Sequence, residues 1–170
     1  RLVLVPGVGP LTRQALLARF GTATATLEAG IDDLNEVPGV GPKLSRRIAL
    51  ARRDIDVDDE LRVCAAHGIR VLIESDAQYP ERLRHIPDPP GALFMTGDLQ
   101  SADVLAVAIV GTRHATHYGL QTAERLACGL AQAGYTIVSG LARGVDAAAH
   151  RGALAARGRT LAVLGSGILH

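Results

Sequence analysis

The chain has 170 residues, of which 48% are hydrophobic and 21% charged, as in an ordinary folded protein of one domain or two small ones. A formal net charge of +1 excludes a molecule that attracts nucleic acid through its overall field, so any such site has to be local. No apolar run approaches the roughly 20 residues that span a membrane. With two isolated cysteines and no signal-peptide pattern, we expect reduced thiols and a cytoplasmic location.

The first sixty-six residues contain an internal repeat. The sequence Val-Pro-Gly-Val-Gly-Pro at 5–10 recurs at 37–42, and a helical pattern follows each copy. A Gly-x-Gly turn between two short helices, with proline at the first position of the second helix, resembles the helix-hairpin-helix motif in tandem, a SAM-like arrangement. We therefore expect a helical domain over residues 1–66.

Helix-hairpin-helix motifs bind a DNA phosphate through the N–H groups of the turn and of the helix start, without reading base sequence. The second turn is followed by Lys43, Arg46 and Arg47, whereas the first is followed by Leu11, Thr12 and Arg13. Secondary DNA contacts are therefore predicted at Gly39, Gly41, Lys43 and Arg46. The alternative, that the tandem only packs and its glycines only serve the turns, stays open.

The stretch from 54 to 95 is expected to bridge two domains. An acidic run at 54–60 predicts a solvated linker and a helix N-terminus, and 69–73 reads as a strand. The density of prolines from 80 to 90 predicts an extended lead-in rather than a helix, with Phe94 as a core residue. The second domain is predicted to cover residues 67–170.

Three apolar runs alternate with helical patterns in this second domain, at 104–110, 135–138 and 160–164. Short continuous apolar runs separated by helices predict an α/β fold, a Rossmann-like parallel sheet buried on both faces. Such sheets bind ligands beyond the carboxyl ends of their strands. Because a doubly wound sheet normally has more strands, we expect this domain to be truncated at the C-terminus.

The first two strand ends carry glycine, hydroxyl residues and an arginine. Glycine lets backbone N–H groups approach a phosphate, a helix start adds partial positive charge, and arginine supplies a fork of donors. The alternative for Arg113 is an ion pair with an acid inside the fold. The predicted nucleic-acid-binding residues are Gly111, Thr112, Arg113, Thr116, Tyr118, Ser139, Gly140, Ala142, Arg143 and Gly144.

Asp146 and His150 are four residues apart, on one helical face. They could form a catalytic acid–base pair, but we favour a structural hydrogen bond that supports the loop. Gly111 opens no Gly-x-Gly-x-x-Gly fingerprint, and no phosphate-binding GxxxxGK[ST] loop is present. We expect no cofactor, no metal and no catalytic residue.

Several segments, in the same order, resemble the DNA-processing protein A family (DprA, also called Smf). They are the Tyr79-Pro80 to Gly97 lead-in, Val110-Gly111-Thr112-Arg113 with Tyr118-Gly119, Ser139 to Asp146 with His150, and the run from Thr160 to Gly167. The resemblance implies that Arg113 and Arg143 are the principal ligands of single-stranded DNA. Many members carry lysine where this chain has Arg143.

The resemblance further implies a non-enzymatic, cytoplasmic bacterial protein of natural transformation. It would protect incoming single-stranded DNA, help load RecA recombinase and act as a homodimer, with no membrane partner. The chief competing hypothesis is a nucleotide phosphoribohydrolase of the lysine-decarboxylase-like Rossmann class, although its Pro-Gly-Gly-x-Gly-Thr-x-x-Glu segment is absent. A purely structural adaptor is a third possibility.

Overall fold

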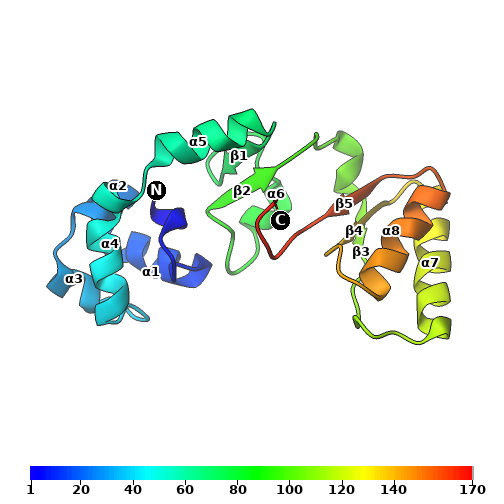
Figure 1. The fold of residues 1–170 in the computed structure, drawn as a ribbon, viewed down its shortest axis with the longest axis horizontal. Helices are drawn as coiled ribbons and strands as arrows, with labels where there is room; N and C mark the ends of the chain where they lie inside the picture. The colour runs from blue at the N-terminus through cyan, green and yellow to red at the C-terminus, as the bar shows by residue number, and fades with distance from the viewer. Residues whose placement is uncertain (170) are drawn as a thin grey trace. The chain divides into compact units, whose positions relative to one another are not determined.

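The computed structural model describes residues 1–169 and divides by its internal contacts into two compact units, Arg1–Thr96 and a second that begins at Gly97 (Figure 1). This division falls later than the predicted boundary at residue 66. The physical reason is that helix α1 (Pro10–Phe20) is bonded to the segment after residue 66. Arg13 Nη2 lies 2.7 Å from Glu74 Oε2, and Gln14 Nε2 donates to the Pro87 carbonyl at 2.9 Å.

The first unit contains the predicted tandem of helix-hairpin-helix motifs. Gly7 and Gly39 take the left-handed backbone at the two turns, with φ of +100° and +83°, and Pro10 and Pro42 open the helices that follow. The prediction of a helical tandem is confirmed. Its helices are η1 (Leu2–Leu4), α1 (Pro10–Phe20), α2 (Ala23–Glu28), α3 (Ile31–Asn35), α4 (Pro42–Asp54) and α5 (Val57–Ala66).

The two copies of the repeat fill one shared core with equivalent side chains. Three apolar residues of the first copy have apolar counterparts 32 positions later, and all six are almost fully buried. The pairs are Leu2 with Leu34, Val5 with Val37, and Leu16 with Ile48. Neither copy could bury these faces alone, so the repetition of the sequence is what builds the core.

An antiparallel pair of strands, β1 (Arg70–Ile73) and β2 (Ala92–Met95), completes the first unit, with the one-turn helix α6 (Glu81–Arg84) between them. The prediction of an entirely extended lead-in was therefore wrong at α6. Phe94 was also wrongly predicted as a core residue, since it is 37% exposed. Side chains alternate along a strand, so Phe94 and its partner Val71 face away from buried Leu72. Tyr79 is the buried aromatic residue instead.

The second unit is a parallel three-stranded sheet with two long helices. In chain order it has η2 (Ser101–Val104), β3 (Ala106–Ala108), α7 (His117–Gln132), β4 (Thr136–Ser139), α8 (Val145–Ala155) and β5 (Thr160–Ala162). The strand order is β3-β4-β5, and all neighbours pair in parallel. The predicted Rossmann-like parallel sheet is confirmed. No helix in the described residues is long and apolar enough to cross a bilayer.

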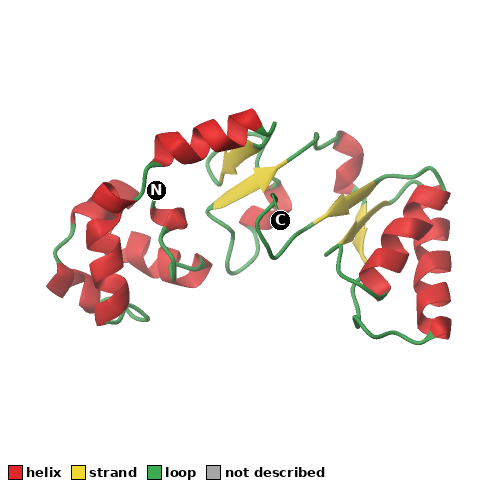
Figure 2. Cartoon of the chain, in the orientation of Figure 1, coloured by secondary structure: helices red, strands yellow, loops and turns green. Residues whose placement is uncertain are grey.

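Both long helices lie on one face of this sheet (Figure 2). Strand connections of this kind are right-handed, and two successive crossovers in the same direction carry their helices to the same side. The helices meet closely at Gly152, where an added Cβ would collide with the Glu124 carbonyl of α7. Their core includes Ile109, Ile137 and Ala149.

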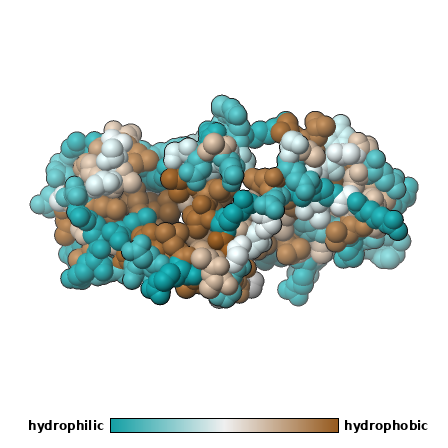
Figure 3. Space-filling view, turned by 90° about the horizontal axis from the view of Figure 1, so that it is seen from above, coloured by the Kyte–Doolittle hydropathy of each residue, from teal (hydrophilic) through white to brown (hydrophobic). Residues whose placement is uncertain are grey.

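The prediction that the strands are buried on both faces was wrong. Only the central strand β4 is largely buried, whereas Val104, Val110 and Val163 of the outer runs are exposed. The reason is the strand order, because within the described part of the second unit, residues 97–169, both α7 and α8 are carried to the first face. Apolar side chains accordingly reach the surface at several places between the polar ones (Figure 3).

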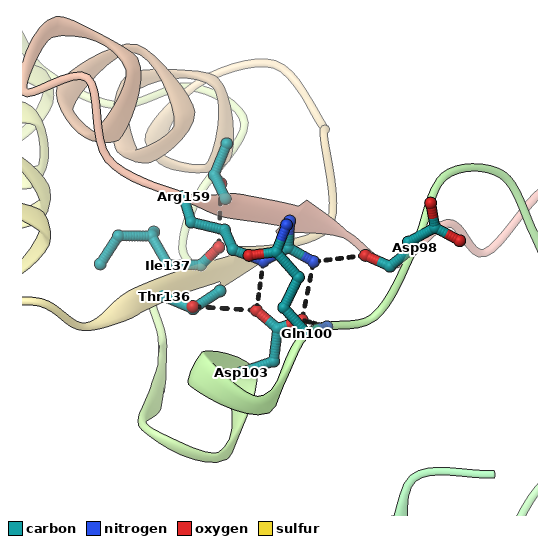
Figure 4. A network of polar contacts seen from close by, with 7 residues as sticks. Asp98, Gln100, Asp103, Thr136, Ile137 and Arg159 are labelled. Atoms are coloured by element: carbon teal, nitrogen blue, oxygen red, sulfur yellow. Dashed lines mark hydrogen bonds and ion pairs between the residues drawn. The ribbon is translucent and has the colours of Figure 1, made fainter. Parts of the chain in front are cut away.

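A polar network fastens the segment before β3 to the edge of the sheet (Figure 4). The guanidinium of Arg159 donates to both carboxylate oxygens of Asp103, and Thr136 Oγ1 and the Gln100 N–H donate to the same carboxylate at 3.0 and 2.8 Å. The Arg159 hydrogen bond is the main cause that lowers the pKa of Asp103. The side chain is only 11% exposed, so this pair is shielded from solvent.

We predict that Asp103→Asn destabilises the protein by about 2 kcal/mol at pH 7, because it removes the charge that four donors share. A carboxyl group whose pKa is lowered by folding stabilises the folded state at pH values above its ordinary pKa of 3.8. That stabilisation is lost as the pH falls through the lowered pKa. The gap between variant and wild type should therefore shrink below pH 3.8 in urea unfolding followed by circular dichroism. Asp54→Asn, in an exposed pair with Arg53, is the control and should change nothing measurable. Equal stability of Asp103→Asn and wild type at pH 7 would contradict the prediction.

Candidate nucleic-acid interface

The two predicted motifs lie at the same edge of the parallel sheet. Ala108 pairs with Val138, so the residues after β3 and the residues that end β4 leave the sheet at one level. The first loop carries Gly111, Thr112 and Arg113, and the second runs from Ser139 to Gly144. Parallel pairing thus brings together two stretches that are about 30 positions apart in the sequence.

The two loops touch through their backbones. The Val145 N–H donates to the Thr112 carbonyl at 3.2 Å. Gly144, with φ of +88°, lies so close that an added Cβ would be 2.9 Å from the Cα of Arg113. A Cβ on Gly111 would likewise be 2.8 Å from the Cβ of Val145. Glycine is required at both positions, because any side chain would push the loops apart.

The carboxylate of Asp146 joins the same two loops from beneath. Its Oδ1 accepts from the Gly111 N–H at 3.3 Å and its Oδ2 from the Gly140 N–H at 3.1 Å. Asp146 is only 7% exposed, so its carboxylate is largely shielded from water. Ser139 adds a buried bond between the strands, donating its hydroxyl to the Ile109 carbonyl at 2.6 Å. One carboxylate and one hydroxyl therefore set the spacing of the loops.

His150 is bonded to strand β5, whereas Asp146 is bonded to the loops that follow β3 and β4. Its Nδ1 lies 2.7 Å from Thr160 Oγ1, and because the Thr160 hydroxyl donates to the Ile137 carbonyl, Nδ1 is the donor to Thr160. Burial lowers the pKa of His150, which favours the neutral ring. The two side chains do not bond to each other, so the arrangement is not that of a hydrogen-bonded acid–base pair.

Arg113 and Arg143 are both exposed, and neither is paired with a carboxylate among residues 1–169. Arg159 and Arg151, by contrast, are bound to Asp103 and Glu124. The alternative that Arg113 pairs with an acid inside the fold is therefore wrong. Two free guanidinium groups on touching loops offer the forked donors that bind phosphate oxygens.

The remaining predicted residues have separate positions. Thr112 Oγ1 accepts from the His114 N–H at 3.1 Å, within the first loop. Thr116 Oγ1 accepts from the Gly119 N–H at 3.1 Å and so caps α7. Tyr118 is 78% exposed in the first turn of that helix. Ala142 accepts the Ala147 N–H through its carbonyl. No hydrogen bond in the described part of the chain joins Thr116 or Tyr118 to the second loop.

Two features of this edge were not predicted from the sequence. Val145 fits against Gly111, and a β-branched residue directly after Gly144 was the available signal. Leu141 takes the left-handed backbone, with φ of +56°, although leucine rarely adopts it. No feature of the sequence pattern indicated this conformation.

In the first unit, the second hairpin presents its basic residues to solvent. Lys43 and Arg46 are exposed in the first turns of α4, directly after the turn formed by Gly39 and Gly41. Neither cation has a carboxylate partner within the described residues. The neighbouring Arg47 is engaged, since its Nη1 donates to the Pro6 carbonyl of the first copy at 3.1 Å.

Comparisons with known proteins agree with this organisation. The model of the DNA recombination-mediator protein A family matches residues 70–170, and that of the SAM-like helix-hairpin-helix tandem matches residues 1–54. The chain is 36% identical to the Synechocystis protein Smf over 168 residues, covering 96% of this chain and 42% of that protein. It is also 36% identical to the DNA processing protein DprA of Bacillus subtilis over 137 residues, covering 80% and 42%.

The X-ray structure of DNA processing protein A from Streptococcus pneumoniae superposes with a TM-score of 0.71 at 29% identity, covering 99% of this chain and 57% of that one. The chain spans about two-fifths of the length of the Synechocystis and Bacillus proteins. Because the family model matches more than half of the chain, including both strand-end motifs, this chain belongs to the DNA recombination-mediator protein A family.

Proposed function

We propose that this chain binds the phosphate backbone of single-stranded DNA at the carboxyl edge of β3 and β4. In the whole protein, the site would protect incoming strands during natural transformation and help load RecA recombinase onto them. The proposal includes a cytoplasmic location, a homodimer and no enzymatic step. The names of the family and of its relatives, which speak of recombination mediation and DNA processing, support the DNA part.

The single observation that carries the proposal is the pair of unpaired, exposed arginines on touching loops. Phosphates of one strand follow each other closely, so a binder needs cations that lie near one another and are free to donate. The backbones that carry Arg113 and Arg143 lie close together, since Gly144 lies against Arg113, and neither guanidinium is held by a carboxylate in the described residues. A net charge of only +1 makes such a local cluster necessary.

A phosphoribohydrolase would use the same edge of the sheet to bind a single phosphate. It would also need a side chain that helps to cleave a glycosidic bond. Asp146 is the carboxylate beneath the two loops, and both of its oxygens are committed to backbone N–H groups. His150 is buried and bonded to Thr160 through Nδ1. The commitment of both Asp146 oxygens favours a binding site over a hydrolytic one.

We further propose that the second hairpin adds sequence-independent phosphate contacts through Gly39, Gly41, Lys43 and Arg46. Its turn presents backbone N–H groups at a helix start, and the two cations are exposed beside them. In this proposal the first hairpin serves mainly for packing, since Leu11 and Gln14 stand where the second copy has Lys43 and Arg46.

The main test is the affinity for a labelled oligothymidylate, measured by fluorescence anisotropy at several salt concentrations. Arg113→Ala and Arg143→Ala should each weaken binding by about tenfold, because a charge-assisted contact is lost. Each should also reduce the slope of log affinity against log salt by about one. Circular dichroism should remain unchanged, since both side chains are exposed.

Arg125→Ala, which removes an exposed arginine from the middle of α7, is the matched control and should bind as wild type does. Unchanged affinity in a folded Arg113→Ala/Arg143→Ala variant would refute the site. Release of adenine from AMP by the wild type would instead favour the phosphoribohydrolase.

The hairpin proposal has its own test. Lys43→Ala/Arg46→Ala should weaken binding to a long oligonucleotide several-fold and lower the salt slope, because two phosphate contacts are removed. Arg52→Ala/Arg53→Ala, at the far end of the same helix, is the control and should have a smaller effect, since both arginines are bonded to acids. Equal affinities of the hairpin variant and wild type would show that the tandem only packs.

A further inference from the structure

Three exposed apolar side chains stand at the ends of the three parallel strands. They are Val110, Leu141 and Val163, which are 72%, 57% and 65% exposed. The Ile109 N–H donates to the Val138 carbonyl and the Val163 N–H to the Ser139 carbonyl, so pairing continues to this level and keeps the three strand ends adjacent. We call this row the apolar edge. Exposed apolar groups gathered in one place commonly mark a contact surface.

The backbone of Leu141 is held in a conformation that favours glycine. Its φ of +56° is costly for a bulky side chain, and such outliers cluster at binding and catalytic sites. The conformation is fixed from both sides, because the Gly140 N–H is bound by Asp146 and the Ala142 carbonyl accepts the Ala147 N–H. Glycine would fit this backbone without strain, so the leucine side chain itself is the feature to explain.

The apolar edge adjoins the two free arginines. Leu141 precedes Arg143 by two residues, Val110 precedes Arg113 by three, and the loops that carry them are in contact. An apolar protein segment that packed on this row would also cover the guanidinium groups of Arg113 and Arg143. Such a segment would offer these two charges no anionic partner. A single strand of DNA offers both chemistries, because each phosphate is followed by a base with an apolar face.

We propose that Leu141, at the strand end between those of Val110 and Val163, contacts the base faces of the strand whose phosphates Arg113 and Arg143 hold, and that this contact makes the site select unpaired DNA. The inference rests on the proposed function. In a duplex the base faces are stacked and paired, so they are closed to the apolar edge. The arginines then supply affinity, and the leucine supplies the preference for a single strand.

The experiment compares two probes that carry the same phosphates, a labelled oligothymidylate and an abasic oligomer of equal length, with a duplex as the third. Wild type should prefer the oligothymidylate over both of the others. Leu141→Gly relaxes the backbone and removes the side chain. It should therefore fold at least as well as wild type and weaken oligothymidylate binding about fivefold, with abasic binding unchanged. Leu141→Asn, a residue that tolerates this backbone, should behave like Leu141→Gly.

Leu154→Ala, on α8, is the matched control, because this leucine is 63% exposed and lies outside the apolar edge. If Leu141→Gly binds both single-stranded probes as wild type does, or loses affinity for both equally, the base contact is refuted while phosphate binding stands. If the row instead joins copies of the chain, Leu141→Gly would change the sedimentation of the free protein, which also overturns the inference. Wild type that binds neither probe would refute the proposed function itself.

Discussion

The site depends on one buried carboxylate. Asp146 holds the Gly111 and Gly140 N–H groups at once, and so ties together two loops that belong to different strands. Without it, these two N–H groups would lose their bonded carboxylate, and the loops would have no shared anchor. Because Asp146 lies in the first turn of α8, the position of that helix also sets the position of both arginine-bearing loops. The packing of α8 against the sheet therefore helps to fix the positions of the two loops at the surface.

The close approach of the loops is a second constraint, and it comes from residues without side chains. Gly111 and Gly144 allow the backbones to meet where any Cβ would collide. A family motif rich in glycine is therefore explained by steric contact between the loops as well as by access to a ligand. Leu141 is the exception, since it keeps a bulky side chain where the backbone favours glycine. That exception motivates its assignment to base contact.

Much of the fold could be predicted from the sequence because its signals are local. The repeated Val-Pro-Gly-Val-Gly-Pro specified two identical turns, and the alternation of apolar runs with helices specified a parallel sheet. The exposure of Phe94 and Val110 could not be predicted in this way, since it depends on which face of a strand a neighbouring element covers. For Val110 the strand order decides that, and strand order is not a local property of the sequence. For the same reason, the sequence indicated Asp146 as loop support but not which donors it would bind.

The central claim is that Arg113 and Arg143 act together on one strand. The most direct measurement is NMR of the arginine Nε–H groups during titration with oligothymidylate. The account predicts that the resonances of Arg113 and Arg143 shift together with one midpoint, while that of Arg159, which is bound to Asp103, stays in place. A shift of only one of the two, or of neither while the oligonucleotide binds, would contradict the account.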